Sequence, residues 1–237
     1  MDGRKVIGVD IGNSSIKAAE FHASEVGEVQ RFDDLTSLVA FFEDAYYVVC
    51  TVSKADHRQF LSHEFTLHHT TPLPLKVDYE TPQTLGMDRV AAAVGAWTLF
   101  PYTDILVIDS GTCITYDLVT ADGTFRGGII SPGLDMRYRA MHEFTSGLPR
   151  LYTGGEPPAQ LVGKSTESCM RIGAEQGLKL EIQAHLESFN KKYDRLQVVL
   201  TGGWQPGFES NIKASIFAGS KIVLGGLHAI WKFNEGY

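Results

Sequence analysis

The sequence predicts an α/β protein of two similar halves, each a mixed sheet with flanking helices. One pattern occurs twice, at 6–17 and at 106–117: an apolar strand ends in Asp, Gly follows two residues later, and a second strand-like stretch comes next. Short apolar strands alternate with helical stretches around both copies. Because the copies lie about 100 residues apart, we expect an N-terminal half at 1–103 and a C-terminal half at 104–237.

The second half restarts the pattern of the first. Turn residues separate the strands of each meander, and three prolines between 70 and 84 predict an extended surface loop. In the first half, the expected strands are 5–10, 16–22, 28–32 and 46–52, and the expected helices are 34–43, 55–61 and 87–99. In the second half, the expected strands are 104–109, 113–119, 124–131 and 196–200, and the expected helices are 134–144, 166–193 and 222–233.

The composition is typical of a soluble globular protein. Of 237 residues, 43% are hydrophobic and 21% charged, and the net charge of -7 argues against nucleic acid as a partner. No apolar run approaches the ~18 residues of a membrane span, and the N-terminus does not have the pattern of a signal peptide. Three widely spaced cysteines favour a reducing compartment, so we expect a cytoplasmic protein without a membrane partner.

The two Asp-x-Gly turns have the chemistry of a phosphate-binding site. The carboxylates of Asp10 and Asp109 are expected to point between the halves and to hold a metal ion, directly or through water. Either turn alone is read as a tight hairpin, but two copies at matching points favour a nucleotide in a cleft between the halves. The residues expected to bind ATP are Asp10, Ile11, Gly12, Asn13, Ser14, Ser15, Ile16, Lys17 and Thr112.

Several of these motifs resemble a known superfamily. Asp10-x-Gly12, Asp109-x-Gly111-Thr112 and Thr201-Gly202-Gly203 resemble the phosphate and adenosine motifs of acetate kinase, sugar kinases, Hsp70 and actin. Within it, the chain is similar to the type III pantothenate kinases, whose motifs occur here in family order. The chain is somewhat shorter than is expected for the family, and Cys113, where Ala is usual, is a mild departure. The matching blocks are Leu85-Gly86-Met87-Asp88-Arg89-x-Ala91, Gly127-Gly128-x-Ile130-x-Pro132-Gly133, Leu148-Pro149 and Gly163-Lys164-Ser165-Thr166.

The resemblance implies a fold and an activity. The fold is two ribonuclease H-like (actin-like ATPase) halves, and the reaction is ATP-dependent phosphorylation of pantothenate to 4'-phosphopantothenate, the first step of coenzyme A biosynthesis. It also implies Mg²⁺ with ATP, a monovalent cation (potassium or ammonium), and a homodimer with the substrate site near the subunit interface. Two alternatives stay open: an ATP-binding regulatory or accessory protein on the same scaffold, and a kinase of another small hydroxy acid or sugar.

The family's roles carry over to particular residues. Asp88 becomes the base that orients the attacking hydroxyl, although a helix-start carboxylate favoured by the dipole is an equal reading of its position. Arg89 offers a planar fork to the pantothenate carboxylate, or else forms a surface ion pair. Asp109 is the expected monovalent-cation ligand, and Asp10 the tentative Mg²⁺ ligand through water. The expected substrate contacts are Tyr79, Gly86, Met87, Asp88, Arg89 and Thr166.

Other candidate sites in the sequence are weaker. The histidines between 57 and 69 have no partner at zinc-ligand spacing. Cys50 lies in an apolar strand pattern and is expected to pack rather than to react. Gly163-Lys164-Ser165-Thr166 lacks the earlier glycine and the strand of a P-loop. Gly127-Gly128 is expected to shape a turn rather than to touch substrate.

Overall fold

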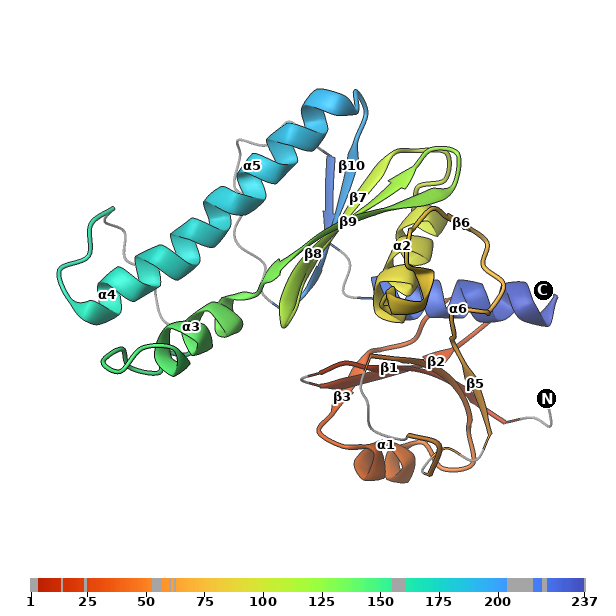
Figure 1. Ribbon diagram of the computed structural model, residues 1–237. Coiled ribbons are helices and arrows are strands. Elements are labelled where there is room, and N and C mark those ends of the chain that lie inside the picture. Colours follow the sequence, from red (N-terminus) through yellow and green to blue (C-terminus); the bar gives the residue numbers. More distant parts are fainter. Residues whose placement is uncertain are drawn as a thin grey trace.

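The computed structural model describes residues 4–13, 15–23, 25–52, 57–59, 61, 63–154, 161–203, 215–218 and 221–236. It confirms the α/β class, with two sheets and flanking helices (Figure 1). No helix within these ranges is long and apolar enough to cross a membrane. The strands are β1 (Val6–Ile11), β2 (Ile16–Phe21), β3 (Gln30–Phe32), β4 (Tyr46–Thr51), β5 (Glu64–Thr66), β6 (Lys76–Val77), β7 (Ile105–Ser110), β8 (Cys113–Thr120), β9 (Thr124–Pro132), β10 (Gln197–Gly202) and β11 (Ser215–Ala218). The helices are α1 (Leu35–Phe41), η1 (His57–Gln59), η2 (Pro82–Thr84), α2 (Met87–Leu99), α3 (Leu134–Glu143), α4 (Thr166–Arg171), η3 (Ile172–Gln176), α5 (Gly177–Lys192) and α6 (Ile222–Glu235).

The two sheets repeat one topology. The first has the order β3-β2-β1-β4-β5, with β1 antiparallel to β2 and parallel to β4. The second runs β9-β8-β7-β10-β11 in the equivalent places, with β7 antiparallel to β8 and parallel to β10. The short strand β6 extends the second sheet beyond β9. The repeat seen in the two turns is therefore a repeat of whole sheets.

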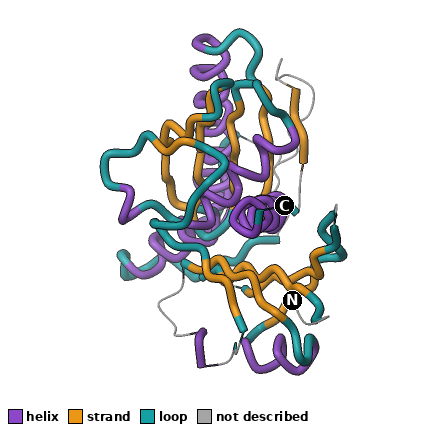
Figure 2. Tube along the Cα trace, turned by 90° about the vertical axis from the view of Figure 1, so that its right-hand side faces the viewer, coloured by secondary structure: helices purple, strands orange, loops and turns teal. Residues whose placement is uncertain are grey.

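Helices α2 and α6 form a layer between the two sheets, where α6 is seen nearly end-on (Figure 2). A Cβ at Gly226 would lie 1.7 Å from the Ala91 carbonyl oxygen, and one at Gly95 would lie 2.2 Å from the Ile222 oxygen. Only glycine permits this approach, because the two helix backbones touch. Buried residues of both sheets pack on this pair of helices. The N-terminus of α2 is therefore fixed relative to both halves.

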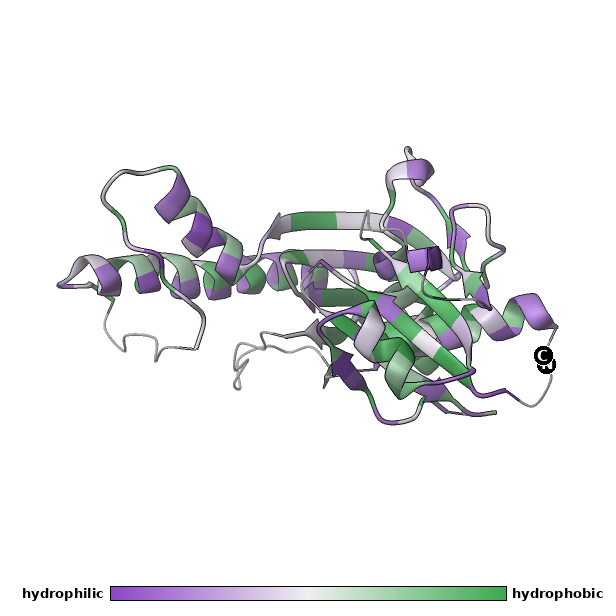
Figure 3. Ribbon diagram, turned by 90° about the horizontal axis from the view of Figure 1, so that it is seen from below, coloured by the Kyte–Doolittle hydropathy of each residue, from purple (hydrophilic) through white to green (hydrophobic). Residues whose placement is uncertain are grey.

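The elements α3, α4, η3 and α5 form an arm that projects from the second sheet (Figures 1 and 3), with hydrophilic and hydrophobic residues alternating along it. The sequence predicts one helix at 166–193, but the π-helical turn η3 interrupts it. Glu175 in this turn is buried and accepts a hydrogen bond from the Tyr138 hydroxyl of α3. Gly173 lies in this turn and Gly177 begins α5; glycine weakens a regular α-helix, which favours the wider turn here.

Most other predicted boundaries agree with the structure to within about two residues, the usual uncertainty of helix and strand ends. Three strands were not predicted: β5, β6 and β11 are short, and each lies at the edge of a sheet. Of the helix predicted at 55–61, the described residues show the 3-10 turn η1, while 55, 56 and 60 lie outside them. Short edge strands lack enough residues for a period to be recognised.

Candidate active site

Strand β1 carries Asp10 to the first predicted phosphate turn. Asp10 stands directly opposite Lys17 in the β1–β2 pair, and Lys17 Nζ lies 3.7 Å from Asp10 Oδ2. Opposed residues of antiparallel strands project to the same face, which brings the amine to the carboxylate. The Gly12 N–H donates to the Ser15 carbonyl at 3.2 Å and closes the turn. Of the other predicted ATP contacts here, Ile11 and Ile16 are buried, Asn13 is exposed, and Ser14 lies outside the described residues.

Strand β7 carries Asp109 to the second turn in the same way. The Gly111 N–H donates to the Cys113 carbonyl at 3.0 Å, and the predicted ATP contact Thr112 is exposed at the tip. The end of β10 packs against this turn, since the Gly203 N–H donates to the Ser110 carbonyl at 3.0 Å. Gly202 has a φ of +98°, and a Cβ there would lie 2.5 Å from Ser110. The Thr201-Gly202-Gly203 turn thus lies beside the second phosphate turn.

Asp88 stands in the first turn of α2, where Gly86 is the N-cap residue. Its Oδ1 accepts a hydrogen bond from the Arg89 N–H at 2.8 Å. A Cβ at Gly86 would lie 2.5 Å from that oxygen, so glycine leaves room for the carboxylate. Met87 is buried in the core beneath the turn. The half-buried Asp88 is held at the positive end of the helix dipole.

Asp10, Asp88 and Asp109 lie within reach of each other's charge. Burial raises the pKa of Asp10 to about 6; Lys17 opposes this rise and the charge of Asp88 adds to it. Burial also raises the pKa of Asp109 to about 6, opposed by Lys17 and strengthened by Asp88 and Asp10. The pKa of Asp88 is raised by burial despite the charge of Arg89. The two turns and the start of α2 therefore bring three carboxylates into one site, and their repulsion favours bound cations.

This site suits cations shared with a nucleotide. Among the described residues, no group of three His, Cys, Asp or Glu side chains is placed to hold a metal ion. Mg²⁺ that accompanies phosphates usually takes one or two carboxylates and keeps several waters, so it does not need such a group. Asp10 and Asp109 each offer one carboxylate, at equivalent strand ends of the two halves.

Arg89 is buried rather than at the surface. Its Nε donates to Asp117 Oδ1 at 3.0 Å, and its Nη2 donates to the same oxygen at 2.5 Å. The guanidinium carbon lies 5.9 Å from the ring centre of Tyr79 and 5.9 Å from that of Phe125. Sequence reasoning missed Asp117, although a charged residue between Tyr116 and Leu118 in an apolar strand is a signal of a buried partner.

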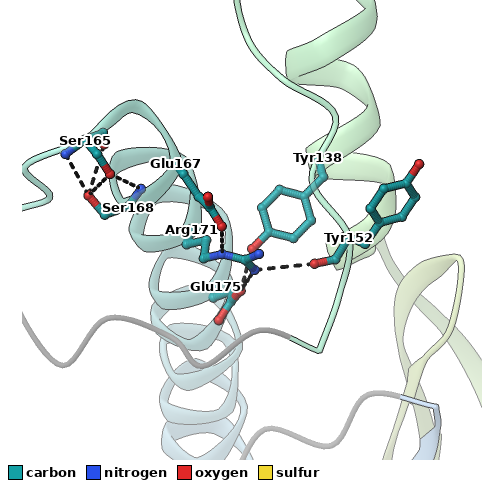
Figure 4. Close-up of polar contacts among 7 residues, drawn as sticks. All are labelled: Tyr138, Tyr152, Ser165, Glu167, Ser168, Arg171 and Glu175. Atoms are coloured by element: carbon teal, nitrogen blue, oxygen red, sulfur yellow. Dashed lines mark hydrogen bonds and ion pairs between the residues drawn. The ribbon is translucent and has the colours of Figure 1, made fainter.

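Thr166 lies away from this group. It is the exposed first residue of α4, at the outer end of the arm, whereas α2 lies between the two sheets (Figure 1). Figure 4 shows what holds this end of the arm. Ser165 caps α4 through reciprocal hydrogen bonds with Ser168, and Arg171 pairs with Glu167 at 3.0 Å. Arg171 also donates to the Tyr152 carbonyl at 3.4 Å, which ties α4 to the preceding segment.

Comparison with solved structures defines the class of the protein. A Campylobacter jejuni protein assigned by its name to the Baf family of transcriptional activators superposes with a TM-score of 0.63, at 21% identity over 98% of this chain and 100% of that one. A Sinorhizobium meliloti protein named as a 2-dehydro-3-deoxygalactonokinase gives 0.61, at 15% identity over 96% of both chains. These likenesses establish the fold. With the repeated sheets and the paired carboxylate turns, the chain has the actin-like ATPase fold.

Sequence comparison gives the family. The model of the type III pantothenate kinases matches residues 47–188. A type III pantothenate kinase of Phocaeicola vulgatus is 41% identical over 96% of this chain and 98% of its own length. Those of Bacteroides fragilis and Cytophaga hutchinsonii are 40% and 37% identical over 96% and 95% of this chain, each over 98% of its own length. The chain belongs to the type III pantothenate kinase family, and its reaction is the phosphorylation of pantothenate by ATP.

Proposed function

We propose that phosphoryl transfer from ATP to pantothenate takes place where Asp10, Asp88 and Asp109 meet. The observation that carries this proposal is that the ends of β1 and β7 and the start of α2 bring these carboxylates together, close enough for Asp88 to raise the pKa of both Asp10 and Asp109. Asp88 orients the substrate hydroxyl and accepts its proton, and its raised pKa improves it as a base near neutral pH. Phosphoryl transfer depends on positioning and charge neutralisation, so a single carboxylate base suffices.

The nucleotide is proposed to bind between the two halves, with 1–103 and 104–237 each contributing one turn. Residues 10–17 hold the phosphates through backbone N–H groups and the Lys17 amine, and Asp10 holds Mg²⁺ through water. Asp109 is the proposed ligand of a monovalent cation, potassium or ammonium, and Thr112 contacts ATP. The bare backbone of Gly202-Gly203 beside the second turn leaves room for adenosine. Since the reaction consumes ATP, a cytoplasmic location belongs to the same proposal.

Pantothenate is proposed to lie along the start of α2. Gly86 and Met87 shape the floor beside Asp88, and Tyr79 and Arg89 line the adjoining wall. Arg89 is the proposed partner of the pantothenate carboxylate.

We also propose a homodimer in which the partner copy supplies Thr166. This residue lies on an arm that carries it away from α2 of its own chain. The arm also exposes large apolar side chains, which is typical of an interface: Phe144, Tyr152, Leu161, Val162 and Leu180 are each more than half exposed. Sedimentation gives the oligomeric state. Mixing Asp88→Asn and Thr166→Val copies is expected to restore about a quarter of wild-type activity, because each mixed dimer has one intact site. No recovery in proven mixed dimers contradicts a shared site.

A coupled assay with pantothenate, ATP, Mg²⁺ and potassium tests the central proposal. Asp88→Asn is expected to lose most of kcat while it still binds ATP, because it keeps the shape and removes the base. Turnover by Asp88→Asn at the wild-type rate contradicts the role of Asp88. ATP binding by folded wild type without turnover of pantothenate favours an accessory protein, and a panel of hydroxy acids and sugars detects another substrate.

A further inference from the structure

The guanidinium of Arg89 lies against Asp117 of β8 and near two aromatic rings. Asp117 of β8 is 1% exposed and Arg89 is 8% exposed, so their ion pair is shielded from water. Nε lies 3.0 Å from Asp117 Oδ1 and 3.2 Å from Oδ2, and Nη2 is bound as well. The rings of Tyr79 and Phe125 lie at the same distance from the guanidinium carbon. This fork-to-fork geometry fixes the plane and the direction of the guanidinium.

The neighbouring strand β9 is adapted to this pair. Gly128 stands opposite Asp117 in the β8–β9 register, next to an irregularity between Asp117 and Val119. A Cβ at Gly128 would lie 1.8 Å from the Tyr116 oxygen and 2.9 Å from Asp117 Oδ1. Gly127 has a φ of +81°, and a Cβ there would lie 3.2 Å from the Tyr79 ring. The Gly127-Gly128 pair therefore makes the space that Asp117 and Tyr79 occupy around Arg89.

Arg89 depends on Asp117 for its orientation. A buried guanidinium without a partner is costly. Asp117 occupies the Nε and Nη2 edge and so fixes the direction in which the rest of the guanidinium faces. A guanidinium that turned away from this direction would leave the substrate carboxylate without its partner.

We propose that Asp117 is a positioning residue for pantothenate recognition, which aims the guanidinium of Arg89 at the substrate carboxylate. The inference rests on the proposed role of Arg89. It also explains Gly127-Gly128, which the sequence predicts only to shape a turn: these glycines leave room for Asp117 and Tyr79. Asp117 itself does not touch substrate and acts through Arg89.

Asp117→Asn tests this role with two substrates. One is pantothenate, and the other is its alcohol analogue, in which a hydroxymethyl group replaces the carboxylate. We expect the KM for pantothenate to rise about 10-fold or more, with kcat changed less than about threefold and the KM for ATP within about twofold. For the alcohol, kcat/KM is expected to equal that of the wild type within about twofold. A general loss of structure would instead change the kinetics of both substrates and of ATP.

Two further variants keep the result decisive. Asp117→Glu retains the buried charge but shifts the guanidinium, so it is expected to fold and to raise the KM for pantothenate alone; it decides the matter if Asp117→Asn does not fold. The double variant Arg89→Lys/Asp117→Asn is expected to be no worse toward pantothenate than Arg89→Lys, because the second change acts through the first residue. Asp122→Asn is the matched control, since Asp122 pairs with Arg126 at 3.3 Å in an exposed position of the adjoining hairpin.

The outcomes separate this inference from the proposed function. If wild type does not distinguish pantothenate from its alcohol, the role of Arg89 is wrong. If wild type distinguishes them and both Asp117 variants do so equally well, with unchanged KM, Asp117 is not a positioning residue. Additive losses in the double variant also overturn the proposal, because they place the two residues in separate roles.

Discussion

The two Asp-x-Gly turns occupy equivalent places in the two sheets but differ in what surrounds their carboxylates. Lys17 stands opposite Asp10, with its amine 3.7 Å from the carboxylate, whereas Thr115 stands opposite Asp109. Residues 12–15 separate β1 from β2, but only 111 and 112 separate β7 from β8. The second turn is also packed by the end of β10.

This difference shows which properties come from the repeat and which from single residues. The repeated sheet places each carboxylate at the end of a strand. The residue across the strand then sets the local charge: Lys17 gives the first turn an amine that suits a phosphate group with Mg²⁺. The second turn has Thr115 rather than an amine opposite its carboxylate, and this suits a monovalent cation. We therefore infer that the two turns share a fold and have different ligands.

The largest expected effect comes from removing each carboxylate in turn. Asp10→Asn is expected to lower kcat about 1000-fold, because it removes the charge that we propose holds Mg²⁺ beside the phosphates. Asp109→Asn is expected to cost about 10- to 100-fold and to abolish the response to potassium. Rates measured with varied Mg²⁺ and potassium separate the two. The exposed Asp44→Asn is the control, and equal loss with an intact potassium response in both variants would make the turns equivalent.

Lys17 gives the next largest effect. It opposes the raised pKa of both Asp10 and Asp109, so its loss should raise both values further. For Lys17→Gln we expect the acid limb of the kcat/KM profile to move up by about one pH unit, with a loss of about 10-fold or more at pH 7.5. Lys5→Gln, which removes an exposed pairing with Glu20, should leave the profile unchanged. An acid limb that stays in place or moves down contradicts the coupling.

Replacing a carboxylate of the site is expected to lower activity but to raise the stability of the cation-free protein. Asp109 has a pKa of about 6 in the folded protein against an ordinary value of 3.8, so the folded state holds its proton more tightly. Its contribution to stability is complete below pH 3.8 and is lost as pH rises through about 6. Asp109→Asn should therefore stabilise the cation-free protein by about 1 kcal/mol at pH 7, a figure reduced for partial exposure to water.

Thermal unfolding in a chelator at several pH values measures this effect. Asp10→Asn should gain less than Asp109→Asn, because it leaves Lys17 without its carboxylate. Both gains should vanish in acid, where the wild-type carboxylates are protonated. A gain of equal size at every pH would have a cause other than titration.

The sequence predicts the fold well where a period or a repeat is present. The strand-ending carboxylates are predictable as a group because the carboxyl ends of β1 and β7 occupy equivalent positions in a repeated sheet. The strands β5, β6 and β11 are missed since they are short and their pairing is decided by neighbours distant in sequence. The π-helical turn is missed for a similar reason: Glu175 faces inward because of Tyr138, which belongs to another helix.

The candidate site is only partly predictable for the same reason. The sequence identifies Arg89 as a guanidinium that can bind a carboxylate. Its partner Asp117, however, lies 28 residues away and is buried by packing that no local sequence pattern predicts. The position of Thr166 follows from the direction of the arm, which depends on the contacts of α3 and α5 rather than on the motif around it. Local motifs therefore identify reactive groups, whereas tertiary packing decides which groups meet.

The smallest expected effect comes from substituting the glycines of the two turns, Gly12 and Gly111. Neither has a positive φ, and a Cβ would lie 3.2 Å from the Ser15 oxygen at Gly12 but no closer than 3.6 Å to any atom at Gly111. Gly111→Ala should therefore change stability by less than about 0.5 kcal/mol.

If ATP phosphates approach the backbone of both turns, the added methyl should raise the KM for ATP about fivefold in each variant, with the KM for pantothenate unchanged. Gly147→Ala is the control, because nothing lies within 4 Å of its Cβ position. A KM for ATP that rises in Gly12→Ala but not in Gly111→Ala would confine the phosphates to the first turn and leave the second to its cation.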